Sequence, residues 1–139
     1  MRRRVALLLA VVVLGACGGD TTREDGERQL SEVTVPAGWT ASTVDYQPAG
    51  MERRYDQWTV NYRNLAPAES AVKDSYAEAL RATGWAACGT GAVHNDLVQG
   101  DYCKKPYEIV LATRRGTSCV PSTMDACTEL TVTLYKVEG

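Results

Sequence analysis

The 139-residue sequence predicts an α+β domain in which an antiparallel β-sheet carries one helix on one face. Apolar residues alternate along residues 54–63 and 129–137, as in strands with one buried face. Between these segments, apolar residues recur at spacings of three and four from Pro67 to Thr83, which is typical of an amphipathic helix. Strands on both sides of a single helix favour a two-layer sandwich with the order β-β-α-β-β-β.

The first two strands are expected at residues 39–46 and 54–63. The earlier segment is rich in threonine and valine, which favour strands. In the later one, Trp58, Val60 and Tyr62 fall on one face because side chains alternate along a strand. The segments can form a hairpin, although the intervening loop is longer than a tight two-residue turn.

The predicted helix has recognisable ends. Pro67 suits its first turn, where no amide donor is needed, and Gly84 can take the left-handed conformation that ends a helix. Trp85 is expected to cover the last turn. After the helix, strands are expected at residues 107–114 and 129–137, with Leu130, Val132 and Leu134 toward the core, and residues 85–88 and 101–104 are candidate short strands.

The first 17 residues have the pattern of an export signal. Arg2, Arg3 and Arg4 precede an apolar run, and the run ends in Leu14-Gly15-Ala16-Cys17. This ending resembles the lipobox of bacterial lipoproteins. The resemblance implies that residues 1–16 are removed and that Cys17, carrying fatty acyl chains such as palmitate, becomes the first residue. The protein would then be anchored to the cell membrane on its extracytoplasmic face.

Two other interpretations of this segment are a membrane-spanning helix and an ordinary secretory signal. A membrane-spanning helix needs roughly 20 apolar residues, and Val5 to Ala16 supplies about 12. An ordinary secretory signal, cut near Ala16, would leave Cys17 as a free thiol. The order of basic, apolar and small residues before a cysteine favours the lipidated form.

The remaining chain divides into a tether and one domain. Residues 17–32 are polar and contain few large apolar side chains, so they are expected to form a disordered tether behind the lipid. Residues 33–139 are expected to fold as a single globular domain, the size for which one hydrophobic core suffices.

Charge argues against a nucleic-acid partner. The net charge is −2, and removal of the three signal arginines leaves −5. Beyond the signal, basic residues cluster only as the pairs Arg53-Arg54, Lys104-Lys105 and Arg114-Arg115. A phosphate-binding surface needs a more concentrated basic face, so these pairs are interpreted as solvated strand ends.

Four cysteines remain after Cys17 is assigned to lipid, an even number that favours two disulfides in an exported protein. Three pairings are possible. We favour Cys88 with Cys103 and Cys119 with Cys127, because sequential pairs close short loops.

Catalytic and metal sites find little support. His94 is the only histidine and lies in a glycine-punctuated loop, and no G-x-S-x-G motif marks a nucleophile. The cysteines lack the C-x-x-C spacing of a zinc site, and Gly89-Thr90-Gly91 does not extend to a phosphate-binding motif. The sequence indicates neither a catalytic residue nor a metal or other cofactor.

Carboxylates and tryptophans are the remaining candidates for a site that hydrolyses or binds an envelope polymer. Paired acids could serve glycoside hydrolysis with a tryptophan as a sugar platform. In a chain without phenylalanine, however, tryptophans are needed in the core. Trp39 is the one most expected to be exposed for binding, because its strand is the least clearly amphipathic. The side chains considered are Glu52, Asp56, Glu69, Asp74, Trp39, Trp58 and Trp85.

These observations favour a non-enzymatic, lipid-anchored accessory domain that binds an envelope protein or polymer. The layout resembles the small helix-on-sheet domains of exported actinobacterial lipoproteins. One alternative is a solute-binding component of a transporter, which usually needs a cleft between two lobes. Another is a small envelope hydrolase built on the scattered carboxylates.

Overall fold

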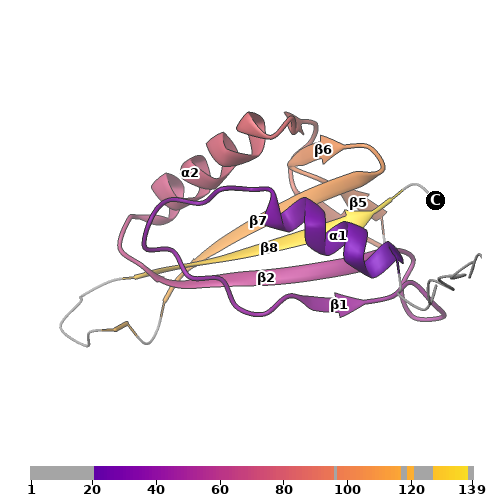
Figure 1. Ribbon diagram of the computed structural model, residues 1–139, viewed down its shortest axis with the longest axis horizontal. Helices are drawn as coiled ribbons and strands as arrows, with labels where there is room; N and C mark the ends of the chain where they lie inside the picture. The colour runs from indigo at the N-terminus through magenta and orange to yellow at the C-terminus, as the bar shows by residue number, and fades with distance from the viewer. Residues whose placement is uncertain (1–20, 96, 117–118, 121–126, 138–139) are drawn as a thin grey trace, which may run out of the picture.

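The computed structural model describes residues 21–95, 97–116, 119–120 and 127–137, and these form an α+β fold with antiparallel strand pairing (Figure 1). A six-stranded sheet has the order β1-β2-β8-β7-β6-β3, and β4 pairs with β5 in a separate hairpin. The elements are α1 Thr21–Ser31, β1 Asp45–Gln47, β2 Asp56–Leu65, α2 Glu69–Ala82, β3 Ala86–Ala87, β4 Ala92–His94, β5 Leu97–Gln99, β6 Tyr102–Lys104, β7 Tyr107–Arg115 and β8 Thr128–Lys136. The predicted α+β class with an antiparallel sheet is confirmed, whereas the predicted order β-β-α-β-β-β is wrong, because a helix precedes the first strand and more strands follow α2.

The long strands β2, β8 and β7 form the centre of the sheet and bury the predicted face. Trp58 of β2 lies opposite Leu134 of β8, which in turn lies opposite Ile109 of β7. All three side chains are fully buried. The same alternation buries Val60 and Val132 in the next row, so the period-two pattern in the sequence identified the core side correctly.

Helix α2 confirms the predicted helix, slightly shortened at both ends. Its apolar stripe of Val72, Tyr76 and Leu80 is fully buried against the sheet. Gly84 has a φ of 90°, and the Trp85 amide donates to the Leu80 carbonyl at 3.1 Å. The glycine therefore ends the helix in the left-handed conformation that the sequence predicted.

The disordered tether predicted for residues 17–32 is wrong from Thr21 onward, because Thr21–Ser31 is helix α1. Leu30 is buried in the core, and the Trp58 indole Nε1 donates to the Arg23 carbonyl at 3.0 Å. Only one helix was predicted, and the composition gave little indication of α1 because its stabilising partner lies 35 residues further along the chain. The folded region accordingly includes residues well before 33. Residues 1–16 and Cys17 lie outside the described residues.

Both helices cover the same face of the sheet. Trp58 and Tyr62 project from one side of β2, since they are four residues apart on a strand. Trp58 packs beneath α1, and the Tyr62 ring lies 5.9 Å from the ring of Tyr76 in α2. The fold thus has a helical layer of two helices, where the sequence predicted one.

Two other segments differ from expectation. The strand predicted at residues 39–46 is reduced to Asp45–Gln47 and an isolated bridge between Ala41 and Tyr62. The loop expected between the third and fourth predicted strands contains the β4–β5 hairpin. Its turn includes Asn95 at a φ of 48°, a conformation that asparagine tolerates better than most residues. Both strands have three residues, too short for alternation to reveal them.

The two favoured disulfide pairs are present. Cys88–Cys103 joins the chain beside β3 to β6, next to the strand pair of Ala86 and Cys103. Cys119–Cys127 closes the loop between β7 and β8, with the two Cα atoms 5.7 Å apart. Each crosslink holds segments that the strand pairing already brings together.

Two tyrosines share the core between β2 and α2. Among the described residues, the Tyr76 hydroxyl has no hydrogen-bond partner, although the residue is fully buried. Burial raises the pKa of Tyr76 well above its ordinary value of 10 and also raises the pKa of Tyr62. The folded state therefore favours the neutral form of each tyrosine.

The Gly26→Ala variant tests whether α1 is part of the folded core. A Cβ at Gly26 would overlap the buried Trp58 indole, so we expect the free energy of unfolding to fall by about 2 kcal/mol. Urea unfolding measures the change. Gly50→Ala is the matched control, because a Cβ there meets nothing within 4 Å. Equal stabilities of the two variants would show that α1 is not packed on Trp58.

The Tyr76→Phe variant is expected to raise the free energy of unfolding by about 1 kcal/mol, because it removes a buried hydroxyl. The pKa of Tyr76 is higher in the folded chain than in the unfolded chain, so its ionisation does not lower the free energy of unfolding below about pH 10. Stability then falls as the pH rises further, since the unfolded chain releases the proton more readily. Urea unfolding near pH 8 and pH 11 should give a shallower loss for this variant. The half-buried Tyr55 supplies the control, and a Tyr55→Phe variant with the same profile would contradict the assignment.

Candidate functional site

The structure separates most of the residues that the sequence singled out. Trp39 is half-buried against the Tyr62 ring, with ring centroids 5.7 Å apart, rather than projecting freely. Trp58 and Trp85 are buried in the core, as expected of structural tryptophans. His94 is exposed on β4. Cys17 lies outside the described residues.

The candidate carboxylates are not gathered into one site. Asp56 accepts hydrogen bonds from the Tyr46 hydroxyl at 3.1 Å and from the Ala49 amide at 3.0 Å, so it fixes the end of the β1–β2 hairpin. Glu69 and Asp74 lie on the exposed surface of α2, which follows β2 in the chain. Strand β2 runs for ten residues, roughly 30 Å, from Asp56 to the end that precedes α2.

A different set of residues comes together between α1, the β6–β7 turn and the end of β8. We call it the basic hollow, a concavity of about 290 Å³. Its lining combines four basic side chains with one carboxylate, although the chain as a whole is acidic. The lining residues are Asp25, Arg28, Gln29, Lys104, Lys105, Pro106, Tyr107 and Lys136.

Strand pairing explains why these residues meet. Lys104 pairs with Tyr107 across the β6–β7 turn, which Lys105 and the cis-bonded Pro106 complete. Tyr107 is in turn opposite Lys136 on β8. The β6–β7 turn and the end of β8 thereby bring three lysines together at one end of the strands. Helix α1 adds Arg28 and Gln29 from above.

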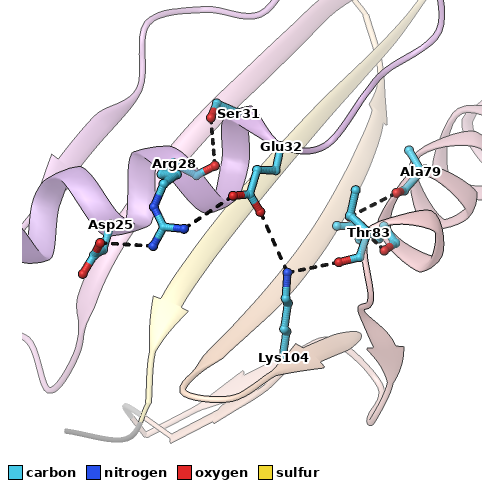
Figure 2. Close-up of polar contacts among 8 residues, drawn as sticks. Asp25, Arg28, Ser31, Glu32, Ala79, Thr83 and Lys104 are labelled. Atoms are coloured by element: carbon cyan, nitrogen blue, oxygen red, sulfur yellow. Dashed lines mark hydrogen bonds and ion pairs between the residues drawn. The ribbon is translucent and has the colours of Figure 1, made fainter.

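Arg28 is held on the surface of α1 by two neighbouring carboxylates. Its guanidinium lies 3.2 Å from Asp25 and 3.4 Å from Glu32, at spacings of three and four residues (Figure 2). All three side chains are largely exposed, so the pairs contribute little to stability. Their effect is to orient the Arg28 side chain along the rim of the hollow.

Lys104 connects the hollow to both helices. Its ammonium donates to the Thr83 carbonyl at the end of α2, at 3.0 Å, and lies 3.9 Å from the Glu32 carboxylate (Figure 2). The ammonium also lies 5.9 Å from the centre of the Trp85 ring. A cation beside the last carbonyls of a helix is favourable because that end carries partial negative charge. Lys104 therefore has a structural role as well as a place in the lining.

Two polar groups complete the lining. The Gln29 side-chain oxygen is buried and has no hydrogen-bond partner among the described residues. Burial raises the pKa of Tyr107, and the nearby Asp25 carboxylate raises it further, so its hydroxyl remains a donor at neutral pH. The hollow thus offers positive charge, a hydroxyl donor and an amide acceptor.

Sequence reasoning missed this site for two reasons. Lys104 and Lys105 were interpreted as a solvated pair, and Arg28 and Gln29 were assigned to the tether. A local signal was present, since Arg23–Glu27 and Arg28–Glu32 are spaced for ion pairs along a helix. That signal indicates a helix but not the surface on which the helix packs.

A second concavity lies where the β4–β5 hairpin meets the sheet. It measures about 120 Å³, and its lining includes Arg53, Tyr55, Val98 and Tyr135. Its charge is less one-sided because Glu52 lies among its two arginines. No group of three or more metal-ligand side chains occurs among the residues that the structure describes. Within the same residues, no helix is long and apolar enough to cross a bilayer.

Comparison with protein-family models, with curated proteins and with solved structures finds no match for this chain. The chemistry of the basic hollow is therefore the basis on which a function can be argued.

Proposed function

We propose that this protein is a lipid-anchored component of the bacterial cell envelope whose domain binds an anionic group in the basic hollow. The anchor is Cys17, and the domain lies on the extracytoplasmic side of the membrane. The proposal is supported by the lipobox-like Leu14–Cys17 segment. The two disulfides agree with it, because disulfides persist mainly in oxidising compartments outside the cytoplasm.

One observation supports the binding role: four cationic side chains gather beside only two carboxylates, Asp25 in the lining and Glu32 next to it. Arg28 can hold a carboxylate or phosphate through two parallel hydrogen bonds, whereas the lysines act as point charges. An acidic protein repels anions over most of its surface, so a local excess of two positive charges, with Asp25 and Glu32 both counted, distinguishes this hollow.

The neutral groups narrow the ligand class. A ligand hydroxyl could donate to the unpartnered Gln29 oxygen, while the Tyr107 hydroxyl could donate to the ligand. Sugar units that carry a carboxylate or a phosphate combine these features. The volume of about 290 Å³ is at the lower limit for enclosed small-molecule sites. The hollow is therefore better suited to one unit of an envelope polymer than to a whole solute captured for transport.

We propose binding without chemistry. His94 lies exposed on the β4–β5 hairpin and is absent from the lining of the hollow. That lining contains no serine, threonine or cysteine side chain that a lysine could activate as a nucleophile. Binding of an anionic group then requires only that α1 and the β6–β7 turn hold the cationic side chains of the hollow in place.

Titration of the mature chain carrying Cys17→Ser with glycerol phosphate and with glucuronate tests the binding site. We expect saturable shifts of amide resonances in α1 and the β6–β7 turn, with Kd values of about 1–10 mM for these single units. Lys136→Gln should weaken binding about fivefold by removing one charge from the lining. Arg63→Gln removes an exposed charge outside the hollow and should leave Kd unchanged. Equal effects of both variants would contradict the assignment.

Membrane fractionation of the Cys17→Ser protein tests the anchor. We expect the variant to leave the membrane fraction while its unfolding midpoint stays the same, because residue 17 precedes the described fold. A Cys88→Ser/Cys103→Ser double variant should remain membrane-bound but lose about 3 kcal/mol of stability. Intact mass measurement of the natural protein should reveal acyl chains on Cys17. An unmodified cysteine, or membrane retention of Cys17→Ser, would overturn the anchor.

A further inference from the structure

The start of α1 limits how far the domain can lie from the lipid. The described part of α1 begins at Thr21, and Cys17 precedes it by only four residues. Four residues span at most about 14 Å, even when fully extended. If Cys17 carries the acyl chains, as the proposed function states, the first turn of α1 is therefore held close to the lipid headgroups. A long tether would have left the orientation of the domain undetermined, whereas this short connection selects one end of it.

Contacts of α1 identify that end. The Arg23 carbonyl accepts the Trp58 indole hydrogen bond, and the Arg23 guanidinium lies 5.8 Å from the centre of the Tyr46 ring. Tyr46 and Trp58 are paired across β1 and β2, close to the connection between these strands. The first turn of α1 and the β1–β2 loop consequently lie at the same end of the sheet, the right-hand end in Figure 1. We call this the proximal end.

The β1–β2 loop has the composition of a membrane-interface contact. The Gly50 amide donates to the Arg53 carbonyl at 2.9 Å, so Met51 and Glu52 form the tip of the loop. Met51 is completely exposed, with a relative accessibility of 106%. Arg53 and Arg54 follow immediately and are also exposed. An apolar tip followed by two cations can place its side chain among acyl chains while the cations meet lipid phosphates.

We propose that the β1–β2 loop, residues 48–55, rests on an anionic lipid bilayer and orients the anchored domain. Met51 enters the interface, and Arg53 and Arg54 contact lipid phosphates. The contact is weak by itself, since each basic residue raises affinity for an anionic surface roughly fivefold and Glu52 opposes part of this gain. The anchor compensates because it holds the loop at a high effective concentration near the headgroups.

This orientation has a consequence for the basic hollow. Lys136 pairs with Asp56 at the start of β2, so the hollow opens near the proximal end. The basic hollow would then bind its ligand close to the membrane surface. The opposite end, where β2 ends and α2 begins, lies roughly 30 Å further away.

Fluorescence quenching in vesicles tests the orientation. Lipidated full-length protein carrying Met51→Cys is labelled with a thiol-reactive nitrobenzoxadiazole dye and placed in vesicles of phosphatidylglycerol and phosphatidylcholine. A lipid with a spin-labelled headgroup is the quencher. We expect at least threefold stronger quenching than for Ser70→Cys, the matched exposed position at the start of α2. Arg53→Gln/Arg54→Gln should lower quenching at residue 51, and so should vesicles of phosphatidylcholine alone.

The outcomes separate this inference from the proposed anchor. Intact mass measurement of the labelled protein reports whether Cys17 is acylated. Acylated protein with equal quenching at residues 51 and 70 would overturn the orientation and leave the anchor intact. Protein without acyl chains would overturn both. Strong quenching at residue 51 that depends neither on the arginines nor on anionic lipid would overturn the proposed contact between these arginines and an anionic bilayer surface.

Discussion

The packing of Trp58 beneath α1 is the interaction on which the rest of the arrangement depends. Trp58 is fully buried at the centre of the sheet, and its indole nitrogen donates to the backbone of α1. Gly26 makes this possible because any larger residue would overlap the ring. A short, mostly polar helix of 11 residues is marginal alone, so tertiary packing must supply its stability. Packing against Trp58 thereby makes the polar helix α1 part of the folded domain.

The position of α1 determines the charge distribution at this end of the molecule. Asp25 and Glu32 offset Arg28, and Glu32 also approaches Lys104. These exposed pairs add little stability, but they bring cations from α1 near those of the β6–β7 turn. A helix packed elsewhere would leave Lys104-Lys105 as the solvated pair that the sequence indicated. The basic hollow is therefore a product of helix packing rather than of a local motif.

The packing of α1 on Trp58 also links the fold to the proposed location of the protein. Because Thr21 of α1 follows Cys17 by four residues, the proposed anchor would be joined almost directly to the core of the domain. The disulfides secure other regions, with Cys88–Cys103 holding the edge strand β3 to β6. Edge strands of two or three residues have few hydrogen bonds of their own, and a crosslink offsets that weakness. Together these features describe a small domain that is crosslinked near the edge of its sheet and covered by α1.

The sequence by itself determined the central strands and helix α2 with its glycine end, and it favoured the disulfide pairing that the structure contains. These features depend on periodicity and short-range spacing, which are visible along the chain. Only the tertiary structure decided that Thr21–Ser31 is helical, that Trp39 lies half-buried on Tyr62, and that lysines from two strand ends meet Arg28. The physical reason is the same in each case: the stabilising partner is distant in sequence, and Trp58 stabilises a helix whose own residues provide too little apolar surface.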